Sequence, residues 1–442
     1  MSRSPILVLI LTAVLAPGLS SCSVFKGGKP KTPTTGPRIA VLNFETKAAI
    51  DPELKDLAVV LPPPAVNADW PQPGGSPAKS MGQLALPDTL SEAWSVKIGK
   101  GSTATRRLNA APVVAGGRIF AMDTDGDVTA LDAASGHRVW SIHLVYKKKV
   151  NAAFGGGVSV ADGKVYATTG FGVVAALDAA TGATVWRKEL TTPFRGAPTV
   201  AGGRVYALTQ DNQLFALSGE KGDTLWSVSG TVEVSGTLSG GAPAVGNDTV
   251  VVGYSSGELN ALRVENGRTV WADALARTGR TTALNALTDI DASPVIDRGR
   301  VFAIGHGGRV AALELATGQR VWERNFAGTN TPWVAGDFIY VVTLDSELVC
   351  LTRGEGKVKW VRQLERYNNP AKKTGAYTWS GPVLASDRLL VAGSNRTLVS
   401  VSPYTGKLIS SVKLGRAAYL PPVVAGNTAF IMTDDGKLTA YR

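Results

Sequence analysis

"LDAASGHRVW", residues 131–140, is the stretch of sequence that decides the fold. It returns with small changes as "LDAATGATVW" at 177–186 and as "LELATGQRVW" at 313–322. In the first two copies an Asp can cap a tight turn, a Gly can take the positive φ of a bulged turn, and a Trp offers a large flat packing surface. A phrase that recurs in this way indicates a chain built from repeated supersecondary units.

The repeat extends along the chain from about residue 90. Each copy has a small-residue segment ending in Pro, an alternating strand, a second strand after a polar turn, and the Asx/Gly turn with a strand that carries Trp. The Pro position marks eight copies at spacings of 38 to 51 residues: Pro112, Val158 in the second copy, Pro198, Pro243, Pro294, Pro332, Pro382 and Pro422.

The apolar residues of these repeats alternate with period two, which indicates strands rather than pairs of helices. We therefore predict an all-β fold, an eight-bladed β-propeller with four-stranded blades, over residues 65–442. The eighth copy stops at "GKLTAYR" without its final strand. The segment "SEAWSVKI" at 91–98 has the form of that strand, with Trp94 in the usual place. We expect this N-terminal strand to complete the last blade and to remove an open sheet edge.

The composition agrees with an all-β fold that is rich in turns. The 442 residues include 50 Gly, only 18% are charged, and the formal net charge is +11. The positive charge is spread along the chain, with short clusters at 147–149 and 372–373, and no Lys/Arg stripe is interleaved with aromatic side chains. This pattern argues against nucleic-acid binding and favours a weak attraction to anionic lipid headgroups.

The first residues have the form of a targeting signal. Arg3 precedes an apolar run at 6–15, which is too short to span a bilayer of about 30 Å as a helix. "LSSC" follows, ending at Cys22, and resembles the lipobox of bacterial lipoproteins, in which the chain is cut before Cys and the thiol is lipidated. We predict a signal peptide at 1–21 and palmitate on Cys22, with a plain secretory signal as the alternative. By the same resemblance, Ser23 after the cysteine implies the periplasmic face of the outer membrane.

Residues 22–64 are predicted to be a lipidated tether. The stretch at 23–37 is rich in Lys, Gly, Pro and Thr and cannot form a core. Asp51 is a good N-cap and Pro52 a good first helical residue, so a short helix is expected to run to about Val59. The "LPPP" that follows would stop it.

The segments expected to line the central channel offer little chemistry. They are mostly small and apolar, and only Arg195 and Asp291 bring charge near the Pro position. A general acid/base pair or a metal site needs several convergent ionisable groups, and the three His residues lack metal-ligand spacing. Cys350 is expected to be a buried thiol in a strand, so no disulfide is expected within the chain. We predict no catalytic, cofactor-binding or metal-binding residues.

The repeat phrase resembles that of enzymes that hold pyrroloquinoline quinone (PQQ) in a β-propeller. Those enzymes carry an adjacent cysteine pair beside the cofactor and a Ca²⁺ site with an Asp base, whereas this chain has only Cys22 and Cys350. A non-enzymatic protein is therefore favoured, and a PQQ-dependent periplasmic dehydrogenase is kept as the alternative.

A lipobox, a tether and eight such blades together resemble the BamB family, lipoproteins of the outer-membrane β-barrel assembly (BAM) machinery of Gram-negative bacteria. "LTDIDASP" at 287–294 is similar to the family's "LSDVDTTP" in the character of each residue. The resemblance implies a scaffold that binds the periplasmic domains of BamA, the barrel-inserting subunit, and assists the insertion of β-barrel proteins into the outer membrane. Nascent outer-membrane proteins are a further candidate partner. A periplasmic binding module for another partner is a further alternative.

The same resemblance implies a docking surface for BamA. The family's acidic pair corresponds to Asp289 and Asp291, for which turn capping is the alternative role. A Leu-x-Leu-Arg-Gly loop of the family corresponds to "VEVSG", which keeps the apolar Val232 and Val234 but has Ser235 in place of Arg. We expect the acidic pair and the apolar pair to lie side by side on one rim of the propeller.

Overall fold

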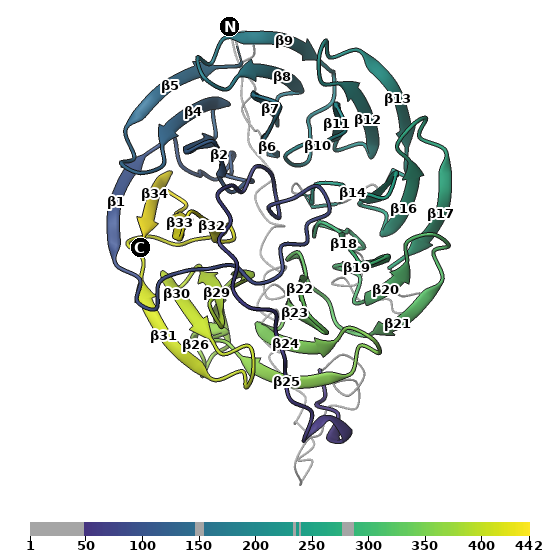
Figure 1. Cartoon of the computed structure of the whole chain (residues 1–442), viewed down its shortest axis with the longest axis vertical. Helices are drawn as coiled ribbons and strands as arrows, with labels where there is room; N and C mark the ends of the chain where they lie inside the picture. The colour runs from purple at the N-terminus through teal and green to yellow at the C-terminus, as the bar shows by residue number, and fades with distance from the viewer. Residues whose placement is uncertain (1–47, 146–153, 233–235, 238–239, 276–286) are drawn as a thin grey trace, which may run out of the picture. The chain divides into compact units, whose positions relative to one another are not determined.

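A computed structural model of the chain describes residues 48–145, 154–232, 236–237, 240–275 and 287–442. In these ranges, eight four-stranded antiparallel sheets stand around a central axis (Figure 1). The fold is an eight-bladed β-propeller, as the repeat predicts. The residues from 45 onward form one compact unit that holds every described strand of the ring.

The strands of each blade follow one another from the channel outward. Blades 1 to 4 consist of β2 (Val113–Ala115), β3 (Arg118–Met122), β4 (Asp127–Asp132), β5 (Arg138–His143); β6 (Gly156–Ala161), β7 (Lys164–Thr169), β8 (Val173–Asp178), β9 (Thr184–Glu189); β10 (Thr199–Ala201), β11 (Arg204–Leu208), β12 (Gln213–Ser218), β13 (Thr224–Ser229); and β14 (Ala244–Gly246), β15 (Thr249–Gly253), β16 (Glu258–Arg263), β17 (Thr269–Ala274).

Blades 5 to 8 follow the same order, with a small hairpin inserted before blade 7. They consist of β18 (Val295–Asp297), β19 (Arg300–Ile304), β20 (Val310–Glu314), β21 (Arg320–Arg324); β22 (Trp333–Ala335), β23 (Phe338–Val342), β24 (Glu347–Thr352), β25 (Val358–Gln363); the hairpin β26 (Tyr367–Asn369) and β27 (Thr374–Ala376); β28 (Trp379–Ala385), β29 (Arg388–Gly393), β30 (Thr397–Val401), β31 (Leu408–Lys413); and β32 (Val423–Ala425), β33 (Thr428–Met432), β34 (Lys437–Tyr441), β1 (Glu92–Lys97).

The Asx/Gly phrase forms the turn between the third and fourth strands. In blade 1 the Asp132 carboxylate accepts the backbone N–H of Ser135 at 2.8 Å, and its carbonyl accepts the N–H of Gly136 at 2.8 Å. Gly136 has a φ of +75°, a conformation that a side chain disfavours. The β4–β5 register shifts between Ala130 and Leu131, as in the bulged turn that the sequence predicts.

The Trp of each phrase connects its blade to the next one. The Trp140 indole N–H donates to the carbonyl of Ala179 in the turn of blade 2 at 3.1 Å. A β-carbon on Gly182 in that turn would lie 2.8 Å from the Trp140 ring, so the glycine makes room for the indole. The same bond from a Trp to the turn of the following blade is made by Trp186, Trp226, Trp271, Trp322 and Trp360.

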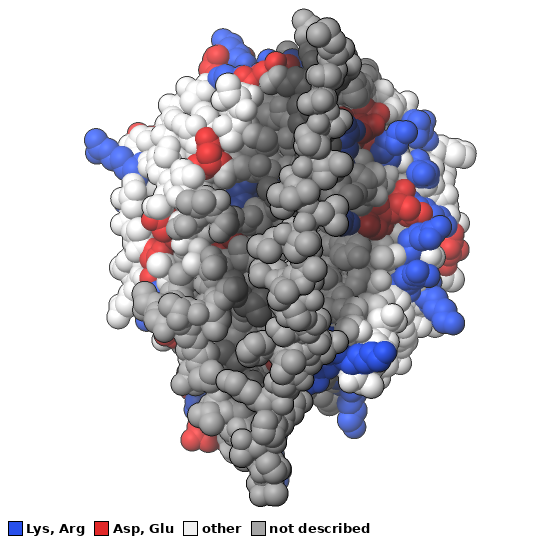
Figure 2. Space-filling model, turned by 180° about the vertical axis from the view of Figure 1, so that it is seen from behind, with Lys and Arg blue, Asp and Glu red and all other residues white. Residues whose placement is uncertain are grey.

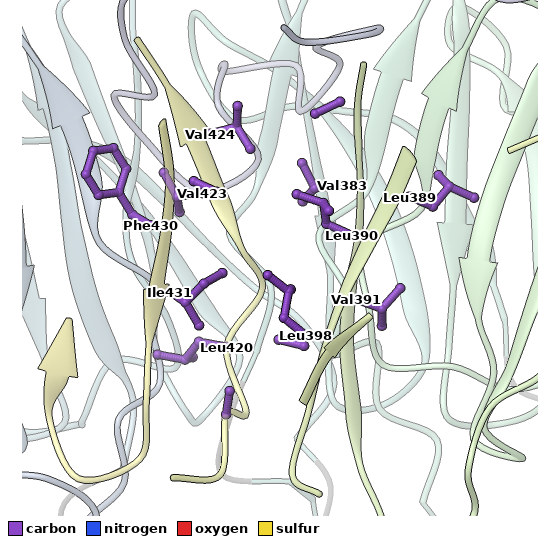
Figure 3. Packing of buried hydrophobic residues seen from close by; sticks show 14 of the residues in the cluster. Val383, Leu389, Leu390, Val391, Leu398, Leu420, Val423, Val424, Phe430 and Ile431 are labelled. Atoms are coloured by element: carbon purple, nitrogen blue, oxygen red, sulfur yellow. The ribbon is translucent and has the colours of Figure 1, made fainter. Parts of the chain in front are cut away.

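The core lies between neighbouring blades. Figure 3 shows this layer between blades 7 and 8, where Val383, Leu390 and Leu398 face Val423 and Ile431. All five side chains are buried. Since burying such a side chain contributes about 1.5–3 kcal/mol, the ring gains most of its stability from these layers.

The N-terminal strand closes the ring, as expected. β1 pairs antiparallel with β34, with Trp94 opposite Ala440 and Val96 opposite Leu438. Ser91 and Arg442 exchange two backbone hydrogen bonds at 2.8 and 2.9 Å, which extends the pairing by one step. Blade 8 is thus assembled from both ends of the ring, and its inner strands do not face solvent.

The stretch before the ring is more ordered than the predicted tether. Residues 48–64 lie along blade 6, where the Asp51 N–H donates to the Val358 carbonyl at 2.9 Å. Asp51 caps a 3₁₀ helix as expected, but this helix covers only Pro52–Leu54. Leu57 beyond it is exposed, so a longer helix would have no face to bury. No helix in the described ranges is long and apolar enough to cross a bilayer. The predicted signal peptide and Cys22 lie outside the described residues.

Residues 65–86, which we call the strap, cross one end of the central channel (Figure 1, purple chain over the centre). The strap meets the inner part of all eight blades in the order in which they stand around the ring. The contacts are Asn67 with Gly426, Trp70 with Val114, Pro71 with Val160, Gln72 with Val200, Pro77 with Val245, Ala78 with Ile296, Gly82 with the Trp333 indole, and Leu84 with Leu384.

Candidate functional site

The central channel is a cup that is closed at one end and open at the other. The cavity measures about 540 Å³, and Trp70, Pro73 and Gly74 of the strap form its floor. Trp70 stacks on Trp333 of blade 6, with ring centroids 6.0 Å apart. The walls are largely the small residues that the sequence predicts at the inner strands. The charged and hydrogen-bonding side chains of the cup therefore lie mainly at its open mouth.

One side of the mouth holds a group of polar side chains from blades 2 to 5 and their connections. We call this group the mouth cluster; it consists of Arg195, Asn212, Thr237, Asp289, Asp291 and His306. These residues come from five separate loops of the same face, because Asp289 and Asp291 share one loop. The cluster therefore ties together loops that the local sequence does not connect.

Arg195 lies at the centre of the mouth cluster. Its guanidinium contacts the carboxylate of Asp289 at 3.2 Å and that of Asp291 at 3.4 Å. The exposed fraction of the Arg195 side chain is 1%, and those of the two carboxylates are 0% and 6%. The side chain of Asn212 accepts a further Arg195 N–H at 3.3 Å. Removing one partner of such a buried pair commonly costs about 3–5 kcal/mol, because the other charge is left without compensation.

Thr237 fastens a second loop onto the same carboxylates. The Asp289 carboxylate accepts the Thr237 backbone N–H at 2.9 Å and its hydroxyl at 3.0 Å, and the hydroxyl also bonds to Asp291. A β-carbon on Gly236 would lie 3.1 Å from the Asp289 carboxylate, so the loop approaches closely at this point. Gly240 leaves space for Arg195 in the same way, at 2.6 Å.

Burial and charge act in opposite directions on Asp289. Its burial, and next the negative charge of Asp291, raise the pKa of the Asp289 carboxyl, whereas the bonds from Thr237 and the charge of Arg195 lower it. The net direction is upward. His306 lies 3.5 Å from Asp291 by its Nδ1, so a second basic group faces the pair.

Three of the four predicted docking residues are described, and they have different surroundings: Asp289 and Asp291 are buried, whereas Val232 is exposed. Asp289 and Asp291 point to the same side, as their alternation predicts, but they bond within the molecule. Val232 lies a few residues before Thr237 in the chain and has an exposed fraction of 64%. Val234 lies outside the described residues. That the four residues contact BamA remains a prediction. The bonds of Asp289 and Asp291 to Thr237 are of the kind that the alternative role, stabilising a turn, requires.

Sequence reasoning missed three members of the mouth cluster. Asn212 and Thr237 sit in ordinary turn and loop sequence, and His306 reads as a turn residue in "GHGGR". One feature of the sequence could have revealed the cluster: Arg195 and Asp291 are the only charged residues near the Pro positions of the channel-lining segments. Two opposite charges placed in an otherwise apolar lining need a partner, and each is the partner of the other.

The residues present do not fit a bound quinone. Cys350, the described cysteine, is fully buried in β24 as predicted and does not line the cup. Its burial raises the pKa of the thiol. The strap fills one end of the channel, and Arg195 is already engaged with Asp289 and Asp291. No trio of His, Cys, Asp or Glu side chains in the described ranges has the geometry of a metal site.

The fold defines the chain as a closed eight-bladed propeller of the quinoprotein repeat type. The charged side chains at the mouth of its channel are paired with one another. Its sequence matches the family described as outer membrane protein assembly factor BamB over residues 84–154, 125–362 and 365–442, and the chain belongs to that family.

Curated relatives agree with this assignment. A protein of Alkalilimnicola ehrlichii, named outer membrane protein assembly factor BamB, is 39% identical over 350 residues, which cover 79% of this chain and 87% of the relative. The protein of that name from Escherichia coli K12 is 30% identical over 357 residues, 79% of this chain and 88% of its own length.

Solved structures share the fold at lower identity. BamB from Moraxella catarrhalis has a TM-score of 0.68 at 20% identity and covers 80% of this chain and all of its own. A europium-containing methanol dehydrogenase has a TM-score of 0.67 at 15% identity and covers 85% of this chain and 98% of its own. At these identities the likeness extends to the fold alone, and the same ring serves proteins of different function.

Proposed function

We propose that this protein is a non-enzymatic scaffold of the BAM complex that binds the periplasmic domains of BamA and assists the insertion of β-barrel proteins into the outer membrane. The observation that carries the proposal is membership of the BamB family across nearly the whole ring. Anchoring by a lipidated Cys22 would hold the scaffold on the periplasmic face of that membrane.

The docking surface in this proposal is the loop pair at the channel mouth. Thr237, in the connection between blades 3 and 4, is bonded to the segment 287–291 through the two carboxylates. Thr231 adds bonds to Glu258 by its N–H at 3.0 Å and its hydroxyl at 2.8 Å. Val232 between these two fixed points is exposed. Because the bonds of Thr231 fix the backbone next to Val232, a partner can bury this apolar side chain at little entropic cost.

In this arrangement the acidic pair acts mainly as a positioning element. Arg195 neutralises much of the negative charge of Asp289 and Asp291, and both carboxylates are buried. Their contribution to binding is then to keep the Val232 loop in place. Direct attraction of a basic partner would be the smaller effect, because buried and paired charges extend little field into solvent.

Binding of the BamA periplasmic domains to variants tests the proposal. The change Val232→Asp should weaken binding by on the order of 1–3 kcal/mol, since it places a charge in the apolar contact. The matched control is Leu225→Asp. Leu225 is an exposed apolar residue on β13, the outermost strand of blade 3, which precedes Val232 in the chain. The control should bind as the unchanged protein does. Equal loss in both variants, or in neither, would place the interface elsewhere.

The double change Asp289→Ala with Asp291→Ala separates positioning from contact. We expect weakened BamA binding together with a lower unfolding midpoint, because the buried Arg195 loses the two carboxylates that compensate its charge. If binding is lost while the midpoint is unchanged, the carboxylates touch the partner directly. Retained affinity in the destabilised protein would argue that this loop pair does not dock at all. Circular dichroism must remain native for any of these comparisons.

The non-enzymatic part of the proposal has its own test. The PQQ-dependent dehydrogenases share the ring, but the floor of the cup here is occupied by the strap and its charges are paired with one another. Incubation with PQQ and Ca²⁺, followed by an assay of alcohol and sugar oxidation with an artificial electron acceptor, should give no turnover above background. Stoichiometric retention of the quinone with turnover would replace the scaffold by an enzyme.

A further inference from the structure

A two-stranded hairpin projects from the face of the propeller on which the cup opens. It occupies residues 364–378, between β25 and β28, and its strands β26 and β27 pair with Tyr367 opposite Ala376 and Asn369 opposite Thr374. The Asn369 side chain accepts the Lys372 N–H at 3.1 Å and fixes the turn. The other seven blade connections in the described ranges carry no such sheet. The hairpin is not needed to close the ring, so a separate role can be sought for it.

The hairpin carries positive charge at its tip and at its base. Lys372 and Lys373 lie in the turn, and both are exposed. Arg396 and Arg416 are exposed on two neighbouring loops of blade 7. These loops are joined to the hairpin and to each other, since the Thr378 N–H donates to the Ser394 hydroxyl at 2.9 Å and the Ala418 N–H to the Gly393 carbonyl at 3.3 Å. We call these four basic side chains the blade 7 basic rim.

The acidic side chains nearby already have partners. Glu365 accepts an amide N–H of Asn395 at 2.8 Å, Asp345 pairs with Arg366 at 2.5 Å, and Asp434 lies 3.7 Å from Arg107. The salt bridges of the described residues include none of the four rim side chains. An excess of positive charge therefore remains on this side of the face. Figure 2 shows Lys and Arg side chains gathered along the side that blades 7, 8 and 1 occupy.

Aromatic side chains accompany the charges. The Tyr367 ring lies under the Arg366 guanidinium at 5.3 Å, and the Tyr377 hydroxyl donates to Asn368 at 3.0 Å. Tyr419, between the rim and the cup, has an exposed fraction of 43%. Tyr and Lys favour the headgroup region of a bilayer, because each has an apolar body and a polar end.

We propose that the hairpin and the blade 7 basic rim bind the phosphate headgroups of an anionic lipid surface. The projecting shape lets the Lys372 and Lys373 side chains reach a flat surface before the rest of the face meets it. The inference rests on the proposed function in one respect, that a lipid anchor would keep the chain beside a membrane. Together, the anchor and the rim would give the propeller two attachments and hence a preferred orientation.

A lipid surface fits these observations better than an acidic protein. The rim charges are spread over a tip and two loops rather than arranged around a pocket, and none is held by a neighbouring acid. Such mobile point charges suit a fluid layer of phosphates, whereas a protein interface is usually organised around an apolar centre. The attraction should be weak, reversible and strongly reduced by salt.

Vesicle flotation with the compact unit that begins at residue 45 tests the proposal without the anchor. The protein should float with phosphatidylcholine vesicles that contain phosphatidylglycerol, at low salt, and not with phosphatidylcholine alone. The double change Lys372→Glu with Lys373→Glu should lower the bound fraction about tenfold or more. The matched control is Lys221→Glu with Lys407→Glu, two exposed lysines in turns on the opposite face of the ring, which should float normally.

A second readout locates the contact. The change Ala371→Cys allows a polarity-sensitive fluorophore to be attached at the exposed tip of the hairpin, because Cys350 is buried, and the emission of this label should shift to shorter wavelength when anionic vesicles are added. No flotation of the unchanged protein at low salt, or equal flotation of the hairpin and control variants, would overturn the proposal. If the hairpin variant instead loses BamA binding while vesicle binding persists, the rim is a protein interface. If only the Val232 variant fails to bind BamA and the hairpin variant fails only to bind vesicles, both the docking surface and the lipid contact are supported.

Discussion

Trp360 of blade 6 lies against Gly406 in the Asx/Gly turn of blade 7, and its indole N–H donates to the Pro403 carbonyl at 2.9 Å. The same contact recurs between successive blades, so the repeat phrase is an interface between blades as much as a turn. Ser410 takes the place of Trp in blade 7. In blade 8 the third and fourth strands are not joined by an Asx/Gly turn, so a Trp at 410 would have no turn glycine to cover.

Replacing Gly406 by Ala should lower the free energy of unfolding by about 2–4 kcal/mol. The glycine has a φ of +69°, and a β-carbon would lie 2.7 Å from the Trp360 ring. The matched control is Gly415→Ala, where an added β-carbon meets nothing within 4 Å. Chemical denaturation of the two variants measures the difference. Equal midpoints would mean that the turn shifts without cost and that the indole contact is not a source of stability.

Replacing Trp94 by Ala tests the closure of the ring by β1. The indole contacts Phe430 of blade 8, with ring centroids 6.0 Å apart, and covers Gly136 of blade 1. Its loss should reduce stability by about 3 kcal/mol and increase aggregation, since β34 would be left as an open edge when β1 detaches. Ser95→Ala, an exposed position in the same strand, is the control. Thermal melts that coincide for the two variants would show that the closure does not limit stability.

Replacing Lys79 by Met should stabilise the protein and remove part of its pH dependence. Lys79 is buried in the strap, its amine donates to the Thr199 hydroxyl at 3.0 Å, and burial lowers its pKa to about 7. Between that pH and the ordinary lysine pKa near 10.5, the unfolded chain binds a proton that the folded chain does not. Stability therefore rises with pH across this window, and below it the full cost of the buried charge remains.

Denaturation midpoints of the Lys79→Met variant and the unchanged protein should differ most below pH 7 and converge towards pH 10. Comparing the two proteins cancels the titration of all other groups. A constant difference across the range would mean that Lys79 stays in one protonation state and that the strap accommodates its charge.

Replacing Cys22 by Ala should release the protein from outer-membrane fractions and abolish labelling by palmitate. The reason is that the lipobox match leaves the thiol as the acceptor of the lipid, and acyl chains anchor by burying about 0.8 kcal/mol per CH₂ group. Cell fractionation with labelled palmitate measures both effects. A variant that still carries label and sediments with the membrane would exclude Cys22 as the anchor.

The sequence by itself determined the ring. The Pro positions, the alternation of apolar residues and the Asx/Gly phrase act over short distances, so each blade is specified by its own residues and eight copies predict eight blades. The missing final strand of the eighth copy predicted the closure by 91–98, because an unpaired sheet edge has to be covered. Asp51 was likewise identified as a cap from its local sequence.

Only the tertiary structure decided what surrounds the channel. Arg195 meets Asp289 and Asp291 across 94 and 96 residues of sequence, and Asn67 of the strap accepts the N–H of Gly426, which belongs to the last blade. Contacts of this kind join loops from different blades and leave no periodic trace in the sequence. They arise because closing the ring brings every inner strand to one axis, where polar groups removed from water must find partners in whichever loops lie beside them.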